Sequence, residues 1–192
     1  MEIVHFPHPT LRHKSKPLKK VNQALKSIVQ EMFDLMYAAR GIGLAANQVD
    51  LPFQLFVINT SGEKGTGEEL VFINPVISNP KGTEAADEGC LSMPGITGQV
   101  SRPSTIHVSA FDLNGNEIDM TATGLLARAI QHESDHLNGV LFIDRVSESE
   151  MKQIELELEE FALEFSANRN SGQIPADDTI KKRLLDLENE YC

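Results

Sequence analysis

The sequence has 192 residues, of which 41% are hydrophobic and 23% charged, as in an ordinary globular protein, so a disordered or fibrous chain is excluded. A formal net charge of −11 disfavours a general nucleic-acid binder, and two cysteines are too few for a disulfide framework. No apolar run approaches the ~20 residues of a membrane span, and residues 1–17 lack the apolar centre of a secretory signal, so a cytoplasmic protein without membrane contact is expected.

The first predicted element is a helix between Val21 and Tyr37. Apolar residues recur there at helical spacing, namely Leu25, Ile28, Val29, Met32, Leu35 and Met36. Asn22 is a suitable N-cap, and Gly41 ends the pattern. Residues 53–59 and 70–77 follow, and their β-branched and aromatic side chains predict two strands.

The second half of the chain predicts a hairpin and three helices. Asn114-Gly115 lies between the alternating segments 105–112 and 117–123, which is a strong hairpin signal. Residues 125–137 and 150–165 return to helical spacing, residues 168–178 are polar and predict a linker, and residues 180–191 predict a short last helix. Strands flanked by helices without regular alternation predict an α+β fold.

The segment that carries chemistry is His132-Glu133-Ser134-Asp135-His136, an H-E-x-x-H pattern in a predicted helix. Four helical residues turn about 400°, so the two imidazoles lie on one face, at the spacing that two ligands of one metal ion need. Glu133 is rotated by about 100° from His132 and can reach a water bound to the metal without ligating it. The pattern therefore predicts a metal-dependent hydrolase.

A catalytic site of this kind needs a third protein ligand. The metzincin pattern fails, because Phe142 stands where the third histidine belongs. Thermolysin-like enzymes use a downstream Glu, for which the candidates are Glu155, Glu157, Glu159 and Glu160, although an acidic solvated helix face also explains them. Upstream, Cys90 in Glu88-Gly89-Cys90-Leu91-Ser92 could supply a thiolate, although a lone cysteine is also a common small core residue.

A third segment, Gly41-Ile42-Gly43-Leu44-Ala45-Ala46-Asn47-Gln48, is rich in small residues that allow a close backbone approach to a ligand or a helix. Gln48 adds a neutral amide donor that could face a developing oxyanion. Taken by itself, the segment is better explained as a tight helix-to-strand turn whose small residues pack together.

Together, the segments 41–48, 88–94 and 131–139 resemble the three motifs of the peptide deformylase family, in family order and of the bacterial type I form. The resemblance extends over residues 3–165, and implies a single catalytic domain at 1–165 with a linker and short helix at 166–192. It also implies antiparallel or mixed sheets around a central H-E-x-x-H helix, with an N-terminal helix and C-terminal helices.

The resemblance implies an activity and a site. The family removes the formyl group from N-formylmethionyl nascent chains and releases formate. Metal-bound water attacks the formyl carbon, with Glu133 as general base and acid, while Gln48 and the Leu91 N–H polarise the formyl oxygen. The implied ligands of one divalent ion are Cys90, His132 and His136. The implied substrate contacts are Ile42, Gly43, Gly89, Leu125 and Ala129.

Further expectations concern the metal, the partners and two arginines. The ligand set suits Zn²⁺, Fe²⁺, Co²⁺ or Ni²⁺, and the resemblance favours Fe²⁺. It also implies an ion pair between Glu88 and Arg102. Arg128 is expected over the pocket mouth with its charged head in water. Transient proximity to the ribosome is an open question and the oligomeric state is not predicted.

The C-terminal segment gives one more expectation. Residues 147–165 have a net charge of −6, which disfavours docking on RNA phosphates. Their apolar stripe should pack on the core instead, and the last helix should pack on the body or on a second subunit.

Two other hypotheses remain: a metallopeptidase that uses a downstream Glu, and a binding module without catalysis.

Overall fold

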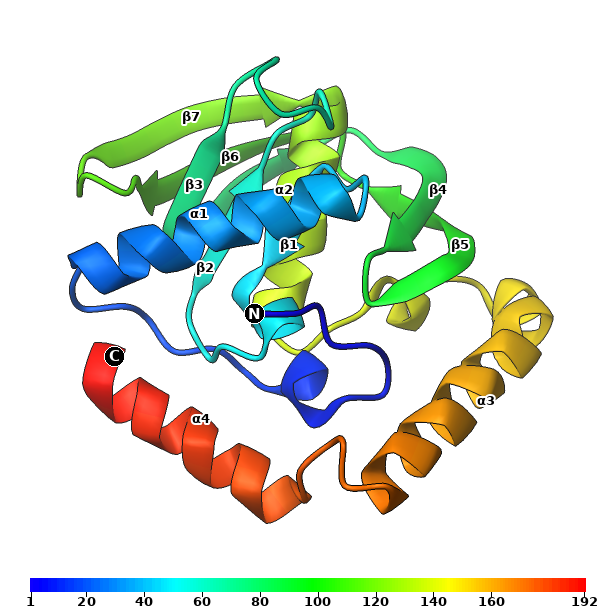
Figure 1. Cartoon of the computed structure of the whole chain (residues 1–192). Coiled ribbons are helices and arrows are strands. Elements are labelled where there is room, and N and C mark those ends of the chain that lie inside the picture. The colour runs from blue at the N-terminus through cyan, green and yellow to red at the C-terminus, as the bar shows by residue number, and fades with distance from the viewer.

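The computed structural model describes all residues from Met1 to Cys192 and has two β layers (Figure 1). The larger is an antiparallel sheet in the order β1-β2-β3-β6-β7, and the smaller is the hairpin β4-β5. The strands are β1 (Gly43–Ala45), β2 (Leu55–Ile58), β3 (Leu70–Lys81), β4 (Glu84–Cys90), β5 (Met93–Arg102), β6 (Thr105–Phe111) and β7 (Glu117–Thr123). The predicted α+β class is confirmed.

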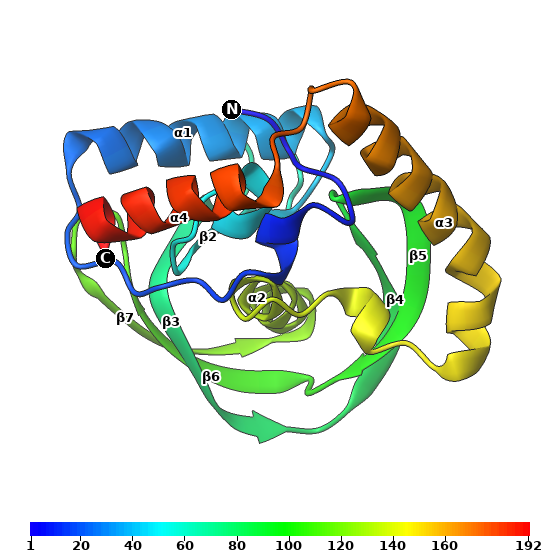
Figure 2. The same cartoon turned by 90° about the horizontal axis from the view of Figure 1, so that it is seen from below.

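The helix α2 (Gly124–Leu137) lies at the centre, with the large sheet on one side and the β4-β5 hairpin on the other (Figure 2). Its small residues Ala127 and Ala129, together with Ile130, pack on buried side chains of the sheet such as Phe56, Phe72 and Val108. A methyl group lets the helix axis come close to the strands. This central position is the one expected for the helix that carries the H-E-x-x-H pattern.

The opposite face of the sheet is covered by α1 (Gln23–Ala38). The Asn22 side chain accepts a hydrogen bond from the Leu25 N–H at 2.8 Å, so the predicted N-cap is confirmed. The helix buries the predicted stripe, including Leu25, Val29 and Met32, in one cluster with residues of β1, β2 and β3.

The strands partly follow the sequence predictions. The hairpin β6-β7 has the expected bounds except that β6 ends one residue early, at Phe111; it pairs Phe111 with Glu117 and places Gly115 at φ 81° in its turn. The strand β2 is shorter than predicted, and β3 continues beyond residue 77 to Lys81. The hairpin β4-β5, which holds the Cys90 segment, was not predicted.

The C-terminal helices α3 (Glu148–Asn170) and α4 (Asp177–Tyr191) wrap the lower side of the body (Figures 1 and 2). Both ends of the predicted linker were wrong, since α3 continues through residues 168–170 and α4 already begins at Asp177. The apolar stripe of α3 packs on the hairpin side of the core, as predicted, and the last helix packs on the body through buried Ile180, Leu184 and Tyr191.

Three 3-10 turns connect these elements: η1 (Pro9–Arg12), η2 (Ala46–Val49) and η3 (Phe142–Asp144). No helix of the structure combines the length and the apolar character that a membrane crossing requires.

Candidate active site

The three predicted ligands converge, although two elements supply them. His132 and His136 lie one turn apart on α2, with ring centroids 5.0 Å apart, and Cys90 ends β4. The Cys90 Sγ lies 3.4 Å from the His136 Nε2. One candidate ligand atom from each of the three residues falls within 4.8 Å of the others. The spacing on the helix thus sets the imidazole pair, and the hairpin brings the sulfur to it.

The buried carboxylate of Glu88 orients His132. Its Oε2 lies 3.0 Å from the His132 Nδ1, so a proton on Nδ1 leaves Nε2 free as a ligand. Arg102 donates to the two oxygens of Glu88 at 2.6 and 2.8 Å, which confirms the ion pair implied by the resemblance. Burial alone would raise the pKa of Glu88, but hydrogen bonds from Arg102 and His132 hold that pKa well below its usual range.

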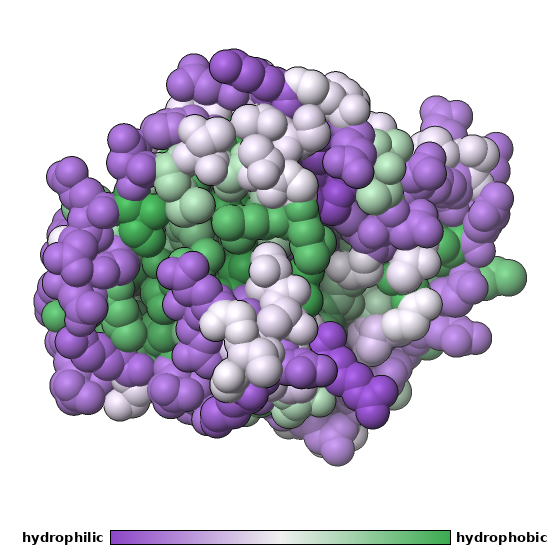
Figure 3. All heavy atoms as spheres, turned by 90° about the horizontal axis from the view of Figure 1, so that it is seen from above, coloured by the Kyte–Doolittle hydropathy of each residue, from purple (hydrophilic) through white to green (hydrophobic).

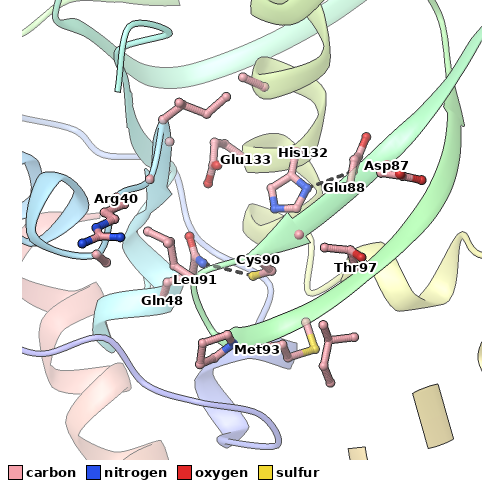
Figure 4. Close-up of a pocket in the computed structure, with 18 of the residues that line it drawn as sticks. Arg40, Gln48, Asp87, Glu88, Cys90, Leu91, Met93, Thr97, His132 and Glu133 are labelled. Carbon is pink, nitrogen blue, oxygen red and sulfur yellow. Dashed lines mark hydrogen bonds and ion pairs between the residues drawn. The ribbon is translucent and has the colours of Figure 1, made fainter. Parts of the chain in front are cut away.

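Gln48 lies in η2 and faces the sulfur (Figure 4). Its Oε1 accepts from the Ala45 N–H at 2.9 Å, and its Nε2 donates to the Cys90 Sγ at 3.3 Å. The side chain is therefore fixed with its N–H groups toward the cluster. The N–H of Leu91, directly after Cys90, has no hydrogen-bond partner within the chain.

One contact residue was missed by sequence reasoning, although it lies inside a quoted motif. The Ser92 N–H donates to the Cys90 Sγ at 3.4 Å, and the Ser92 Oγ accepts from the Gln48 Nε2 at 3.3 Å. Ser92 is fully buried. Its position two residues after the predicted ligand was the available signal.

Glu133 points from α2 into the same region, where it is 4% exposed and its Oε2 has no hydrogen-bond partner (Figure 4). Burial raises the pKa of Glu133 to about 7, against the charges of His132 and Arg102, which lower it. The close neighbour of its carboxylate is the backbone of Gly43, where a Cβ would overlap the Glu133 Oε1.

A cavity of about 450 Å³ opens beside this cluster. Seen from above, the molecule has a hollowed face on which apolar side chains gather (Figure 3). The size suits a small peptide-like ligand. Leu125 is 53% exposed and lies at its mouth. His136 alone of the predicted site residues lies outside the lining, which includes Ile42, Gly43, Gln48, Gly89, Cys90, Leu91, Leu125, Ala129, His132 and Glu133.

Arg128 lines the cavity, as expected, but the expectation that its charged head lies in water was wrong. Its guanidinium does not reach into water but donates to the Glu88 Oε1 at 2.7 Å, to the Val100 carbonyl at 2.9 Å and to the Glu84 carbonyl at 2.7 Å. The side chain is 13% exposed. Acceptors on the neighbouring hairpin bind the charged head, and the helix pattern alone could not reveal them.

The donor set fits a divalent metal ion. One sulfur and two imidazole nitrogens are ligands that Zn²⁺, Fe²⁺, Co²⁺ and Ni²⁺ accept, and Glu133 supplies a buried, unpartnered carboxylate oxygen nearby. The downstream carboxylates considered as third ligands are exposed on α3 and outside the cluster, so that alternative is not supported. An H-E-x-x-H helix with a cysteine and a buried glutamate beside a cavity defines a metal-dependent hydrolase.

Comparison with known proteins names the family. A family model described as polypeptide deformylase matches residues 1–152. Peptide deformylase of Rhodopirellula baltica is 48% identical over all of this chain and 95% of its own length. Peptide deformylase 1B, chloroplastic, of Solanum lycopersicum is 42% identical over 96% of this chain and 66% of its own length. A crystal structure of Arabidopsis thaliana peptide deformylase 1B in complex with an inhibitor superposes with a TM-score of 0.83 at 44% identity, covering 92% of this chain and 97% of that one.

The chain belongs to the peptide deformylase family. The protein is thus an enzyme, a hydrolase of the class that removes the N-formyl group from nascent polypeptides. This assignment leaves no support for a binding module without catalysis or for a peptidase of internal bonds.

Proposed function

We propose that Cys90, His132 and His136 together bind one divalent ion and that Glu133 transfers the protons of formyl hydrolysis. The observation that carries the proposal is the convergence of the three ligand atoms within 4.8 Å of one another beside the buried Glu133. A divalent ion held there would act as a Lewis acid and lower the pKa of water. Glu133 accepts a proton from the attacking water and delivers one to the departing amine, which gives formate and a free N-terminus.

Two donors then hold the negative charge that develops on the formyl oxygen. The Gln48 Nε2 is fixed near the sulfur, and the Leu91 N–H is free to donate. Fixed donors of this kind each contribute about 3–4 kcal/mol to lowering the barrier. Because its Oε1 is occupied by the Ala45 N–H, Gln48 presents N–H rather than C=O to the substrate.

The substrate backbone binds as an added strand beside β1, near Ile42 and Gly43, and beside Gly89 of β4. The support is that β1 pairs only with β2 and is an edge of the sheet, so its other side can accept a peptide. The methionine side chain lies in the cavity between Ile42, Leu125 and Ala129, which all line it.

We also infer that Fe²⁺ is the native ion, with Zn²⁺, Ni²⁺ or Co²⁺ as replacements that the ligand set accepts. The catalytic domain is residues 1–165, with residues 166–192 as an added segment. Action on nascent chains places the enzyme in the cytoplasm. Transient contact with the ribosome does not use α3, because residues 147–165 carry a net charge of −6.

The test is formate release from formyl-Met-Ala-Ser by the native chain and by Glu133→Ala, with metal analysis of both samples. The native chain should contain one metal per molecule and release formate. Glu133→Ala should keep the metal and lose about 10²–10⁴-fold in turnover. Retained turnover in this variant would overturn the role given to Glu133, and Cys90→Ala with full metal content would overturn the ligand set.

A further inference from the structure

We propose that Arg128 is a positioning residue of the metal site: it clamps the β4-β5 hairpin to α2 and so fixes the Cys90 sulfur relative to the two imidazoles. This inference rests on the proposed ligand set. Arg128 lies outside the three motifs, one helical turn before His132, and it makes its hydrogen bonds to hairpin acceptors and to none of the candidate ligands.

The need for a clamp follows from how the ligands are distributed. Both imidazoles belong to α2, but the sulfur belongs to a two-stranded hairpin that has no ladder to the larger sheet. A hairpin of two strands is marginally stable by itself in water. The distance from the sulfur to the imidazoles therefore depends on contacts between the hairpin and the rest of the body.

Arg128 makes three such contacts, all from α2 to the hairpin. Its Nη1 donates to the Glu88 Oε1 at 2.7 Å and to the Val100 carbonyl at 2.9 Å, and its Nη2 donates to the Glu84 carbonyl at 2.7 Å. The acceptors lie on both β4 and β5. A planar guanidinium can hold several acceptors in fixed directions, which an ammonium group cannot do.

Glu88 connects the clamp to the ligands. Its Oε1 accepts from Arg128 and from Arg102, and its Oε2 accepts from Arg102 and from His132. Arg128 and His132 thus hold one carboxylate from two successive turns of the same helix (the contact of Glu88 with His132 is drawn in Figure 4). Glu88 lies two residues before Cys90 on the same strand, so fixing this carboxylate restrains the sulfur as well.

The other polar contacts between α2 and the hairpin do not replace Arg128. Arg102 donates to Asp135 at 2.7 Å near the C-terminal end of α2, and His132 meets Glu88 in the middle. Only Arg128 reaches the carbonyl of Glu84, at the start of β4 and far along the hairpin from Cys90. Without it, the N-terminal half of α2 has no hydrogen bond to the hairpin, and the hairpin can tilt about its remaining contacts.

The experiment measures Co²⁺ binding by the metal-free full chain for the parent, Arg128→Met and Arg128→Lys. Co²⁺ reports the site through a sulfur-to-metal charge-transfer band and through its weaker ligand-field bands. Arg183→Met is the matched control, because it removes an arginine ion pair, with Asp50, on α4 far from the hairpin. Circular dichroism and the melting temperature of each metal-free chain measure folding separately.

Arg128→Met should raise the Co²⁺ dissociation constant by about 10–100-fold and weaken the charge-transfer band relative to the ligand-field bands. Arg128→Lys keeps the positive charge but not the planar guanidinium with its several fixed donors, so it should recover only a small part of the affinity. Arg183→Met should bind Co²⁺ like the parent. If Arg128→Met fails to fold, the clamp is tested by comparing the Co²⁺ affinity and spectrum of Arg128→Lys with those of the parent.

Parent-like Co²⁺ affinity and spectrum in Arg128→Met, or full recovery in Arg128→Lys, would overturn the clamp. A parent chain that binds Co²⁺ with no charge-transfer band would instead refute Cys90 as a ligand, which is the failure of the proposed function. The two failures are therefore distinguished by the parent spectrum alone.

Discussion

Gly43 of β1 and Glu133 of α2 approach each other so closely that a Cβ on the glycine would overlap the Glu133 Oε1. The backbone of Gly43 is not in the left-handed region, so the constraint is one of space and not of conformation. The absence of a side chain at residue 43 therefore fixes where the carboxylate can lie.

Gly43→Ala should displace Glu133 and lower kcat for formyl-Met-Ala-Ser by about 10²-fold, a loss at the low end of what proton transfer contributes. Steady-state formate release measures it. Gly98→Ala is the matched control, because its Cβ would crowd the Val146 side chain at 2.7 Å, away from the cavity. Both variants should lose stability by a similar overpacking cost of about 1–3 kcal/mol, but only Gly43→Ala should lose turnover. Equal turnover in the two variants would contradict this account.

The role of Gln48 can be separated from its packing. Gln48→Glu keeps an acceptor for the Ala45 N–H but replaces the donor that faces the Cys90 sulfur, whereas Gln48→Leu removes both. An oxyanion donor predicts a fall in kcat of about 10²–10³-fold in both variants. A packing role predicts turnover near the parent value for Gln48→Glu. Metal content is measured in each sample, so that loss of the ion is not mistaken for loss of the donor.

His8 should make stability depend on pH. Burial lowers its pKa below 6.5, as do the charges of Arg183 and Arg169, and Asp50 opposes them. A histidine whose pKa is lower in the folded chain than in the unfolded chain stabilises the fold when the histidine is neutral. The contribution of His8 to stability is complete above pH 6.5 and is lost as the pH falls from there through the pKa of His8 in the folded chain. The neutral Nδ1 also accepts from the Thr10 N–H at 3.3 Å.

His8→Asn keeps a neutral capping acceptor and cannot titrate. The melting temperature of the native chain should therefore fall more than that of the variant between about pH 7.5 and pH 5.5, a range that spans the ordinary histidine pKa. Groups of the metal site titrate in both proteins and cancel in the difference. Parallel melting curves across this range would rule out His8 as the titrating group.

The adjacent leucines of α4 offer a matched pair for its packing. Leu184 is 3% exposed and Leu185 is 55% exposed. Leu184→Ala should destabilise the fold by about 2–3 kcal/mol, near the low end for a buried leucine, while Leu185→Ala should stay within about 0.5 kcal/mol. Denaturant unfolding measures both. Formate release should be unchanged in either variant, since α4 contributes no residue to the cavity. A Leu184→Ala variant that folds but is inactive would contradict this and show that α4 affects the active site.

The identity of the ion can be tested by exposure to air. An Fe²⁺ preparation should lose activity as the iron or the Cys90 sulfur oxidises, whereas Zn²⁺ has no redox chemistry and should retain activity longer. Samples of both are kept in air and under nitrogen and assayed for formate release over time. Equal half-lives in air would contradict an iron–thiolate site.

Local sequence patterns were sufficient for the helices and for the β6-β7 hairpin, because each of these buries one regular stripe. The β4-β5 hairpin was not predicted, since β4 (EAADEGC) alternates exposed residues with Glu88 and Cys90 rather than with apolar side chains. The predicted strand ended at residue 77, short of the observed end of β3 at Lys81, because Pro80 interrupts the strand pattern; a register shift between Ser78 and Lys81 accommodates that part of the strand.

The candidate site could be predicted residue by residue from the motifs, but its supporting contacts could not. The spacing of His132 and His136 follows from the helical repeat, which needs no tertiary information. The bonds of Arg128 join α2 to carbonyls more than 25 residues earlier in the chain, and only the folded structure brings these groups together. From the helix pattern alone, the charged head of Arg128 was expected to lie in water.

The enclosure of α2 between the two β layers has a consequence for hydrogen exchange. An amide in the middle of this helix can meet solvent only when most of the domain opens, so it should exchange near the global unfolding limit. The β4-β5 hairpin can open at a lower free energy, since it pairs with no other strand. Partial opening would therefore separate the cysteine from an intact pair of histidines and leave a half-site of two nitrogens.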